Sequence, residues 1–202
     1  MMKITAIILA GGKNRRLGRI KALEPVGNQR LIERVLAKLK PISSQILIVT
    51  SLEQPDLAID GEAEILTDHY SAKGPLGGIY TGLLSSQSDY NLVVACDMPF
   101  LNQGLLGYML RFTENYDLIL PRSDNLVEPL HAIYSKNCLV YIEYLLKEDR
   151  LQILELLNMV KVRYIEADEI NRVDPEHLSF FNINTEADLA KANELARAEA
   201  QT

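Results

Sequence analysis

Cysteine, long apolar runs and positive charge are all scarce in this sequence. The two cysteines, Cys96 and Cys138, have no metal-ligand spacing and make no disulfide framework. No apolar run approaches the roughly 18 to 20 residues that a membrane-spanning helix needs. The stretch after Met1 also lacks the apolar segment and small-residue cleavage site of a secretory signal peptide. We therefore expect a cytoplasmic protein that works in reducing conditions and has no membrane partner.

Positive charge is concentrated as well as scarce. The chain has 27 acidic residues against 21 lysines and arginines, a net charge of −6, which argues against a nucleic-acid partner. Directly after Gly11-Gly12, however, one short segment is strongly basic and contains Lys13, Arg15, Arg16, Arg19 and Lys21. Such charges repel one another unless an anion compensates them, and glycines let backbone N–H groups approach a phosphate. The pattern predicts a loop that binds a small anion, although a glycine pair alone could equally form a tight turn.

Two phosphate-binding motifs are absent from this loop. It contains neither G-x-G-x-x-G nor G-x-x-x-x-G-K-[ST], which argues against a dehydrogenase and a P-loop ATPase. No serine or cysteine has a supporting base in the sequence, so covalent catalysis has no support. Among the three histidines, we expect His131 to be hydrogen-bonded and partly buried rather than catalytic.

The order of apolar segments predicts an α/β fold. Short apolar runs alternate with segments whose apolar residues recur at helical spacing. The predicted strands are 4–10, 46–49, 63–66, 92–96, 117–120, 130–134 and 160–165, and the predicted helices are 31–39, 74–84, 105–112, 137–147, 150–158 and a last one starting at Thr185. Thr185 and Asp188 have the spacing of a capping box at the start of this last helix. This alternation predicts a mostly parallel sheet covered by helices on both faces. At 202 residues we expect a single domain spanning 1–202.

Polar residues follow several of the predicted strands. Gly11-Gly12, Thr50, Asp68 and Asp97 all come directly after an apolar run. In open α/β sheets, ligands bind at the carboxyl ends of the strands. We therefore expect these residues to meet at one edge of the sheet.

Asp97 is the most informative of them. It follows five apolar residues, and a carboxylate is costly to bury without a partner. It could cap the next helix, with Pro99 at the first helical turn. It could also bind Mg²⁺, which prefers oxygen ligands and shares its shell with substrate phosphates. The basic loop expected at the same edge favours the metal ion.

Two further segments are candidate ligand contacts. The glycines of Gly74–Gly78 open a helix and suit close approach to a ligand, although a plain turn would also explain them. Asn182 and Asn184 alternate along an extended segment, so both amides should face the same side. Turn formation is an equally good explanation for these two asparagines.

Taken together, these motifs resemble a known family. Leu9-Ala10-Gly11-Gly12, Arg16-Leu17-Gly18 and Lys21 match the nucleotidyltransferase signature L-A-G-G-x-x-x-R-[ML]-G-x-x-K. The blocks at 74–78, 95–100, 129–134 and 181–185 (G-P-L-G-G, A-C-D-M-P-F, P-L-H-A-I-Y and F-N-I-N-T) make the chain similar to the molybdenum cofactor guanylyltransferases. The matches occur in order over about residues 5 to 192.

The resemblance implies a three-layer α/β/α, Rossmann-like nucleotidyltransferase fold that joins GTP to molybdopterin with Mg²⁺ and releases pyrophosphate. It implies a mainly nucleotide-binding N-terminal half and a mainly molybdopterin-binding C-terminal half. The implied nucleotide contacts are Leu9, Ala10, Gly11, Gly12, Lys21, Thr50, Asp68 and Asp97. The implied molybdopterin contacts are Gly74, Leu76, Gly78, Asn182 and Asn184. Arg16, Lys21 and Asp97 would be catalytic, with Asp97 holding the metal, and protein partners would be molybdenum-insertion proteins and molybdoenzyme chaperones.

Two positions depart from the family pattern. Ile20 replaces the aspartate that commonly precedes the signature lysine, and Glu24 stands where an apolar residue is usual. The rival functions are cytidylyl transfer to molybdopterin, sugar-phosphate nucleotidyl transfer and non-catalytic nucleotide binding by an adaptor. Base preference and pyrophosphate release distinguish these rivals.

Overall fold

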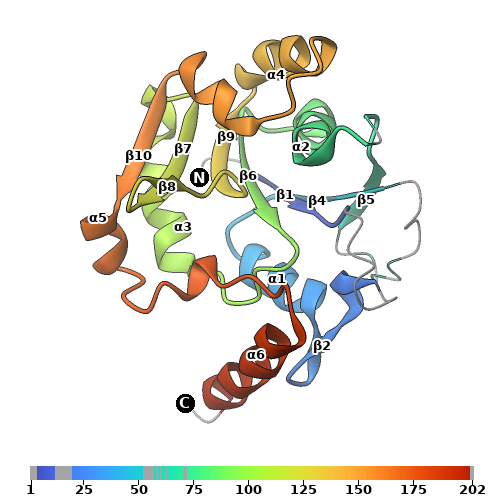
Figure 1. Cartoon of the computed structure of the whole chain (residues 1–202), viewed down its shortest axis with the longest axis vertical. Helices are drawn as coiled ribbons and strands as arrows, with labels where there is room; N and C mark the ends of the chain where they lie inside the picture. Colours follow the sequence, from blue (N-terminus) through green and yellow to red (C-terminus); the bar gives the residue numbers. More distant parts are fainter. Residues whose placement is uncertain are drawn as a thin grey trace.

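A mostly parallel sheet runs through the middle of the structure, with helices on both faces (Figure 1). The computed structural model describes residues 4–11, 20–51, 57, 59, 61, 63–70 and 72–200. The strands of the main sheet are β1 Thr5–Leu9, β4 Gln45–Thr50, β5 Glu64–Thr67, β6 Tyr90–Ala95, β7 Leu118–Ser123, β8 Leu126–Val127, β9 His131–Ser135 and β10 Val162–Glu166. Within the described residues they lie in the order β10-β7-β9-β6-β1-β4-β5, and β8 pairs with β7.

Strand directions confirm the predicted mostly parallel sheet, and within the described residues β8 and β9 run against the others. β1 runs parallel to both β4 and β6, and β4–β5 and β7–β10 are also parallel pairs. β9 is antiparallel to β6 and β7. A tight turn at Asp124 and Asn125, both with positive φ, joins β7 to β8. This turn reverses the chain, so β8 and then β9, three residues further on, both run antiparallel to β7. A parallel return would need a crossover of a dozen or more residues.

Helices cover each face of the sheet through a separate apolar cluster. On one face, α1 (Leu31–Leu39) and α3 (Gln103–Met109) pack against side chains such as Ile8 and Val94. On the other, α2 (Gly74–Ser85) and α4 (Cys138–Lys147) pack against Ile7 and Val93. Alternate residues of the same strands thus supply both cores. This arrangement confirms the three-layer α/β/α architecture.

Helix α2 approaches β1 closely because glycines face the strand. A Cβ atom on Gly82 would lie 2.5 Å from Ile7 Cγ2, and one on Gly78 would lie 3.1 Å from Leu9 Cδ2. A side chain at Gly82 would therefore force the helix away from the sheet. The glycine-rich sequence of α2 serves helix–sheet packing at these two positions.

Several short elements were not predicted from the sequence. They are the hairpin of β2 (Pro25–Val26) and β3 (Gln29–Arg30), the strand β8 and the helix α5 (Ala167–Asn171). The helix predicted over 150–158 was wrong in type, because Ile153–Asn158 forms a 3₁₀ helix. The remaining 3₁₀ helices within the described residues are Lys21–Leu23, Leu110–Asn115 and Leu178–Phe180. None of the helices in the described part of the chain is long and apolar enough to cross a membrane.

The last helix, α6 (Glu186–Glu199), joins the C-terminal segment to the N-terminal third of the chain. It lies beside β2 at one end of the molecule (Figure 1). A third apolar cluster links them and contains Val26, Leu31, Phe100, Ile183, Ala192 and Ala196. The backbone N–H of Gly27 donates to Asn193 Oδ1 at 2.9 Å, and Arg34 of α1 forms an ion pair with Glu199. The hairpin after the signature lysine therefore rests directly on α6.

Candidate active site

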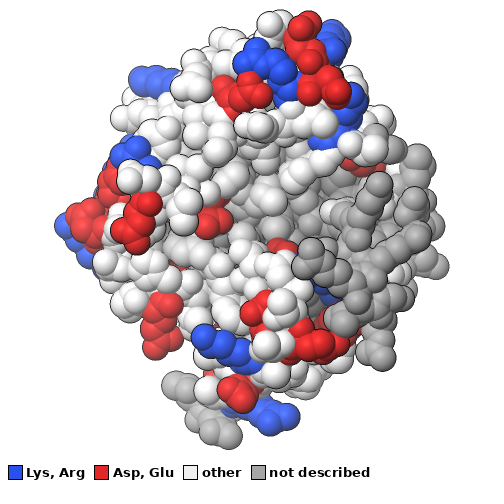
Figure 2. All heavy atoms as spheres, viewed as in Figure 1, with Lys and Arg blue, Asp and Glu red and all other residues white. Residues whose placement is uncertain are grey.

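The loops that follow the parallel strands meet at one edge of the sheet, as predicted. Backbone hydrogen bonds continue beyond the strand ends, from Ala10 N to Val49 O (2.9 Å), from Cys96 N to Leu9 O (3.1 Å) and from Asp68 N to Thr50 O (2.8 Å). These bonds hold the ends of β1, β4, β5 and β6 in register. Seen from the side of Figure 1, charged side chains lie mostly around the periphery of the molecule, and its central hollow is largely uncharged (Figure 2).

Three sequence-distant residues form a polar contact at this edge. Lys21 Nζ lies 2.7 Å from Asp97 Oδ2, and it donates a second hydrogen bond to Asn184 Oδ1 at 3.1 Å. The side chains of Lys21 and Asp97 are only 16% and 19% exposed. Partial burial strengthens this ion pair relative to one at the open surface.

The protein backbone places each of these residues. Lys21 begins a 3₁₀ turn, and Asp97 lies two residues after the end of buried β6. The N–H of Ile183 donates to the carbonyl oxygen of Asp97 at 3.1 Å, so the segment before α6 is fastened beside β6. Asp188 Oδ2 accepts from the N–H groups of Asn184 and Thr185 at 2.9 and 2.8 Å, and these bonds lower the pKa of Asp188. The predicted capping box at Thr185 and Asp188 is confirmed and holds Asn184 at the site.

The second oxygen of Asp97 suits a hard cation. Asp97 Oδ1 is buried and has no hydrogen-bond partner among the described residues. An unpartnered buried carboxylate oxygen is costly, and Mg²⁺ would satisfy it. Within the described chain, no group of three or more histidine, cysteine, aspartate or glutamate side chains could hold a metal ion. A metal at Asp97 would therefore complete its shell with substrate oxygens and water.

The neighbouring thiol takes no part in such chemistry. Cys96 is buried beside Asp97, and burial, followed by the charge of Asp97, raises the pKa of its thiol to about 12. A thiol with this pKa is protonated at neutral pH, and a protonated thiol is neither a nucleophile nor a metal ligand. Cys96 is therefore not a candidate nucleophile at this site.

Asp68 shapes the turn that leads into α2. Its Oδ1 accepts from Tyr70 N at 2.9 Å and from the Thr81 hydroxyl at 3.0 Å. A Cβ atom on Gly77 would lie 3.3 Å from Asp68 Oδ2, so the glycine leaves space beside that oxygen. Asp68 is only partly buried, which leaves its carboxylate within reach of a ligand.

The first glycine loop is only partly described. Leu9 and Ala10 are nearly buried, and a Cβ atom on Gly11 would lie 3.2 Å from the backbone N of Ser51. The glycine therefore lets the loop pass close to the end of β4. Gly12 and Arg16, together with the basic residues Lys13, Arg15 and Arg19, lie outside the described residues.

Some predicted contacts could reach a ligand only through their backbone. Thr50 is 1% exposed, and its hydroxyl lies 3.4 Å from the carbonyl oxygen of Leu66. Leu76 is fully buried in the core, and Gly78 faces Leu9. Gly74 is exposed at the start of α2 with φ +63°, a conformation that favours glycine.

The two asparagines before α6 make different contacts. Asn182 Nδ2 donates to the carbonyl oxygen of Phe180 at 3.2 Å, whereas Asn184 contacts Lys21. Ile183, between them, is buried, which agrees with the predicted alternation. Both asparagines thus flank Asp97, but only Asn184 touches the lysine. No feature of the sequence indicated this contact.

The prediction for His131 was wrong in two respects. This histidine is fully buried, and neither ring nitrogen has a hydrogen-bond partner among the described residues. Its ring packs edge-on against Phe180, with 5.2 Å between the ring centroids. Burial lowers the pKa of His131 to about 4, so the imidazole is neutral at physiological pH.

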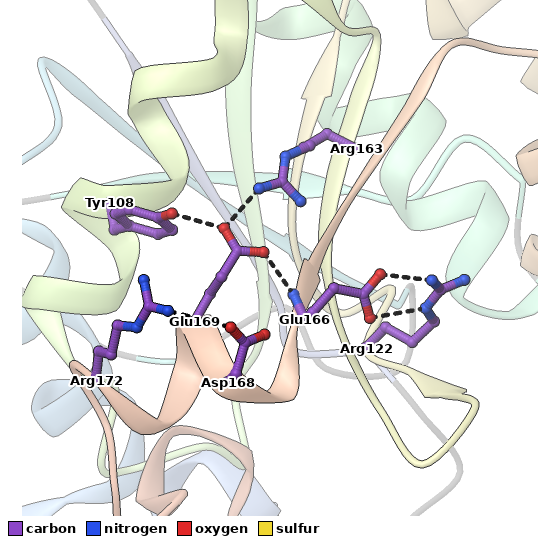
Figure 3. A network of polar contacts seen from close by, with 7 residues as sticks. All are labelled: Tyr108, Arg122, Arg163, Glu166, Asp168, Glu169 and Arg172. Atoms are coloured by element: carbon purple, nitrogen blue, oxygen red, sulfur yellow. Dashed lines mark hydrogen bonds and ion pairs between the residues drawn. The ribbon is translucent and has the colours of Figure 1, made fainter.

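A separate polar network fastens α5 to the sheet (Figure 3). Glu169 accepts from the Tyr108 hydroxyl at 2.6 Å and from Arg163 at 2.5 Å, and its second oxygen accepts from Glu166 N at 3.0 Å. Glu166 in turn pairs with Arg122 of β7. Because these charges compensate one another, the network is structural.

Fold and site together define a nucleotidyltransferase, with a glycine loop after β1, a lysine beyond it and a carboxylate after β6 at the carboxyl edge of a parallel sheet. Residues 6–161 match the family described as MobA-like NTP transferase domain. The chain is 36% identical to a probable molybdenum cofactor guanylyltransferase of Pelotomaculum thermopropionicum, over 97% of this chain and 95% of that protein. A molybdenum cofactor guanylyltransferase of Desulfosudis oleivorans is also 36% identical, over 98% of each chain.

A solved structure supports the same assignment. Molybdopterin-guanine dinucleotide biosynthesis protein A from Archaeoglobus fulgidus superposes with a TM-score of 0.84 and 30% identity, covering 96% of this chain and 99% of that one. The chain belongs to the molybdenum cofactor guanylyltransferase family.

Proposed function

We propose that the protein transfers the GMP moiety of GTP to molybdopterin, forming molybdopterin guanine dinucleotide and pyrophosphate. The observation that carries the proposal is the contact of Lys21 with Asp97 and Asn184, at 2.7 and 3.1 Å, at the edge where nucleotides bind in this fold. The names of the full-length relatives, which are guanylyltransferases, support the choice of base and acceptor.

The chemistry needs no nucleophile from the protein. An oxygen of the molybdopterin terminal phosphate attacks the α-phosphorus of GTP. The new P–O bond forms as the bond to the β-phosphate oxygen breaks, and pyrophosphate leaves in line. Both reactants are anions, so the main barriers are their repulsion and the negative charge that grows on the leaving group. Lys21 supplies a fixed positive charge against both, and Arg16 would add a second.

Asp97 would hold Mg²⁺ through the unpartnered Oδ1 while Oδ2 keeps Lys21 in place. Bound Mg²⁺ supplies neutralising charge to the phosphates. One carboxylate would thus hold both cations, with Oδ1 for the metal and Oδ2 for Lys21.

The two substrates would bind on either side of this centre. The nucleotide side comprises Leu9, Ala10, Gly11, Gly12, Lys21, Thr50 and Asp68. The molybdopterin side comprises Gly74, Leu76, Gly78, Asn182 and Asn184. Thr50, Leu76 and Gly78 would contribute backbone groups, because their side-chain positions face the core or the strand. Asn182 and Asn184 flank the centre from the opposite end of the chain.

We further propose that residues 1–202 act as one domain, in the cytoplasm, with molybdenum-insertion proteins and molybdoenzyme chaperones as protein partners. The cluster that joins Val26 and Leu31 to Ala192 and Ala196 supports the single domain, because it unites both ends of the chain.

Thermal unfolding with each of four nucleotides plus Mg²⁺ tests the base preference. A ligand that binds only the folded state raises the melting temperature, so GTP should give a larger shift than CTP, UTP or ATP. A larger shift with CTP would indicate cytidylyl transfer instead.

Pyrophosphate release then separates an enzyme from a nucleotide-binding adaptor. Asp97→Asn keeps an oxygen for Lys21 but loses the charge for the metal, and it should lower release about 100-fold or more. Full turnover in this variant would contradict the metal assignment.

A further inference from the structure

The amide of Asn184 has only one orientation that suits Lys21. A lysine ammonium has three donors and no acceptor, so the atom that faces it at 3.1 Å is the oxygen Oδ1 rather than the nitrogen. Lys21 uses a second donor on Asp97 Oδ2 at 2.7 Å. Among the described residues Lys21 has these two acceptors, which leaves one N–H of the ammonium for a third.

Asn184 is held more firmly than an ordinary exposed asparagine. Its backbone N–H donates to Asp188 Oδ2 at 2.9 Å, within the capping box that starts α6. The preceding residue, Ile183, is buried and donates its N–H to the carbonyl oxygen of Asp97. The acceptor that meets Lys21 is thus placed by the fold before any ligand arrives.

We infer that Asn184 is a positioning residue for Lys21. Asp97 Oδ2 and Asn184 Oδ1 hold the ammonium from two sides and leave its third N–H directed to a nucleotide phosphate. Without Asn184, the flexible lysine keeps only one fixed acceptor and loses its defined direction. The contact joins positions that are 163 residues apart, so the C-terminal segment acts on the nucleotide-side lysine.

The inference rests on the proposed function for the identity of the nucleotide, but not for the position of Lys21. A first experiment therefore uses the ligand-free protein labelled with [¹⁵N]lysine. An ammonium held by two oxygens should give a distinct side-chain N–H signal, which the Lys21→Ala variant identifies by its loss. Asn184→Ala should shift or broaden this signal. A signal that is missing in the wild type, or unchanged in Asn184→Ala, overturns the inference.

Asn193→Ala provides the matched control. Asn193 is an asparagine on the same α6, and its Oδ1 accepts from Gly27 N at 2.9 Å without touching Lys21. General loosening of α6 would affect both variants alike. We expect the Lys21 signal to survive in Asn193→Ala, and an equal effect of both variants would contradict a specific role for Asn184.

Calorimetric titration with the nucleotide and Mg²⁺ gives the second readout. Asn184→Ala should weaken nucleotide affinity about tenfold, the effect of losing one hydrogen bond to a charged group. In a Lys21→Ala background the same substitution should have no further effect. Equal losses in both backgrounds would show a structural role and overturn the inference.

The choice of nucleotide separates the inference from the proposed function. If a nucleotide other than GTP binds best, the proposed function fails, but the two backgrounds can still be compared with that nucleotide. If none of GTP, CTP, UTP and ATP binds the wild-type protein, the proposed function and the inference both fail.

Discussion

At the scale of single residues, the two polar atoms of one side chain can have very different surroundings. Asp97 is the clearest example, since Oδ2 contacts Lys21 while Oδ1 is buried and has no partner in the described part of the chain. Both ring nitrogens of His131 are likewise buried and have no hydrogen-bond partner among the described residues. For Asp97 a cation would resolve this cost. For His131 the cost is limited because the imidazole stays neutral. Protonation would place a charge at this buried position, so the stability of the protein depends on pH.

Stability should fall in mild acid because of His131. Its pKa is about 4 in the folded protein and about 6.5 when unfolded, so between these values only the unfolded chain binds the proton. The stabilising contribution is therefore complete above pH 6.5 and is lost as pH falls towards 4, at no more than about 1.4 kcal/mol per pH unit. Urea unfolding at a series of pH values measures this slope.

His131→Phe is the control for this effect, because it keeps a ring beside Phe180 but does not titrate. The lowered pKa values of Asp117, Glu169 and Asp188 also destabilise the fold in acid, and they do so in both proteins. The difference between the two slopes therefore isolates His131. Parallel pH profiles would contradict a buried, neutral histidine.

At the scale of elements, the packing of α2 on β1 sets the distance between two segments that form the site. α2 starts beside Asp68 and passes over β1, which ends in the glycine loop, so the distance between them affects both nucleotide-side segments. Gly82 allows this approach because its missing Cβ would otherwise lie 2.5 Å from Ile7 Cγ2. Neither residue belongs to the site, yet both set its dimensions.

Gly82→Ala should destabilise the protein by about 1–3 kcal/mol, since the added methyl group overpacks the interface with Ile7. Gly107→Ala is the matched control, because Gly107 is an exposed position of α3 with nothing within 4 Å of the added atom. That substitution should stabilise by about 0.5–1 kcal/mol through helix propensity. Urea unfolding of both variants checks the opposite signs, and two changes of equal sign would contradict the packing argument.

At the scale of the whole molecule, three apolar clusters and a few long-range polar contacts unite distant parts of the chain. Two clusters lie on opposite faces of the sheet, and the third joins α6 to β2 and α1. Arg34 is 8% exposed, stacks on Phe100 and pairs with Glu199 near the end of α6. The C-terminal helix thereby supports the hairpin that follows Lys21.

Much of this architecture could be predicted from the sequence because local patterns encode it. The apolar run Ile4–Ala10 predicted β1, and Thr185 with Asp188 predicted the start of α6. Other features depend on contacts between distant residues, which no local pattern records. The Lys21–Asn184 contact and the complete burial of His131 belong to this second group.

The two buried thiols give the folded molecule a built-in reporter of global opening. Cys96 and Cys138 lie in clusters on opposite faces of the sheet, and burial raises the pKa of each to about 12. A thiol-specific reagent at neutral pH should therefore react with neither until the chain opens, and both should then react at one rate. The labelling rate, followed against urea concentration, would measure the opening free energy without any engineered probe. Rapid modification of one cysteine in the native protein would show that its layer opens on its own.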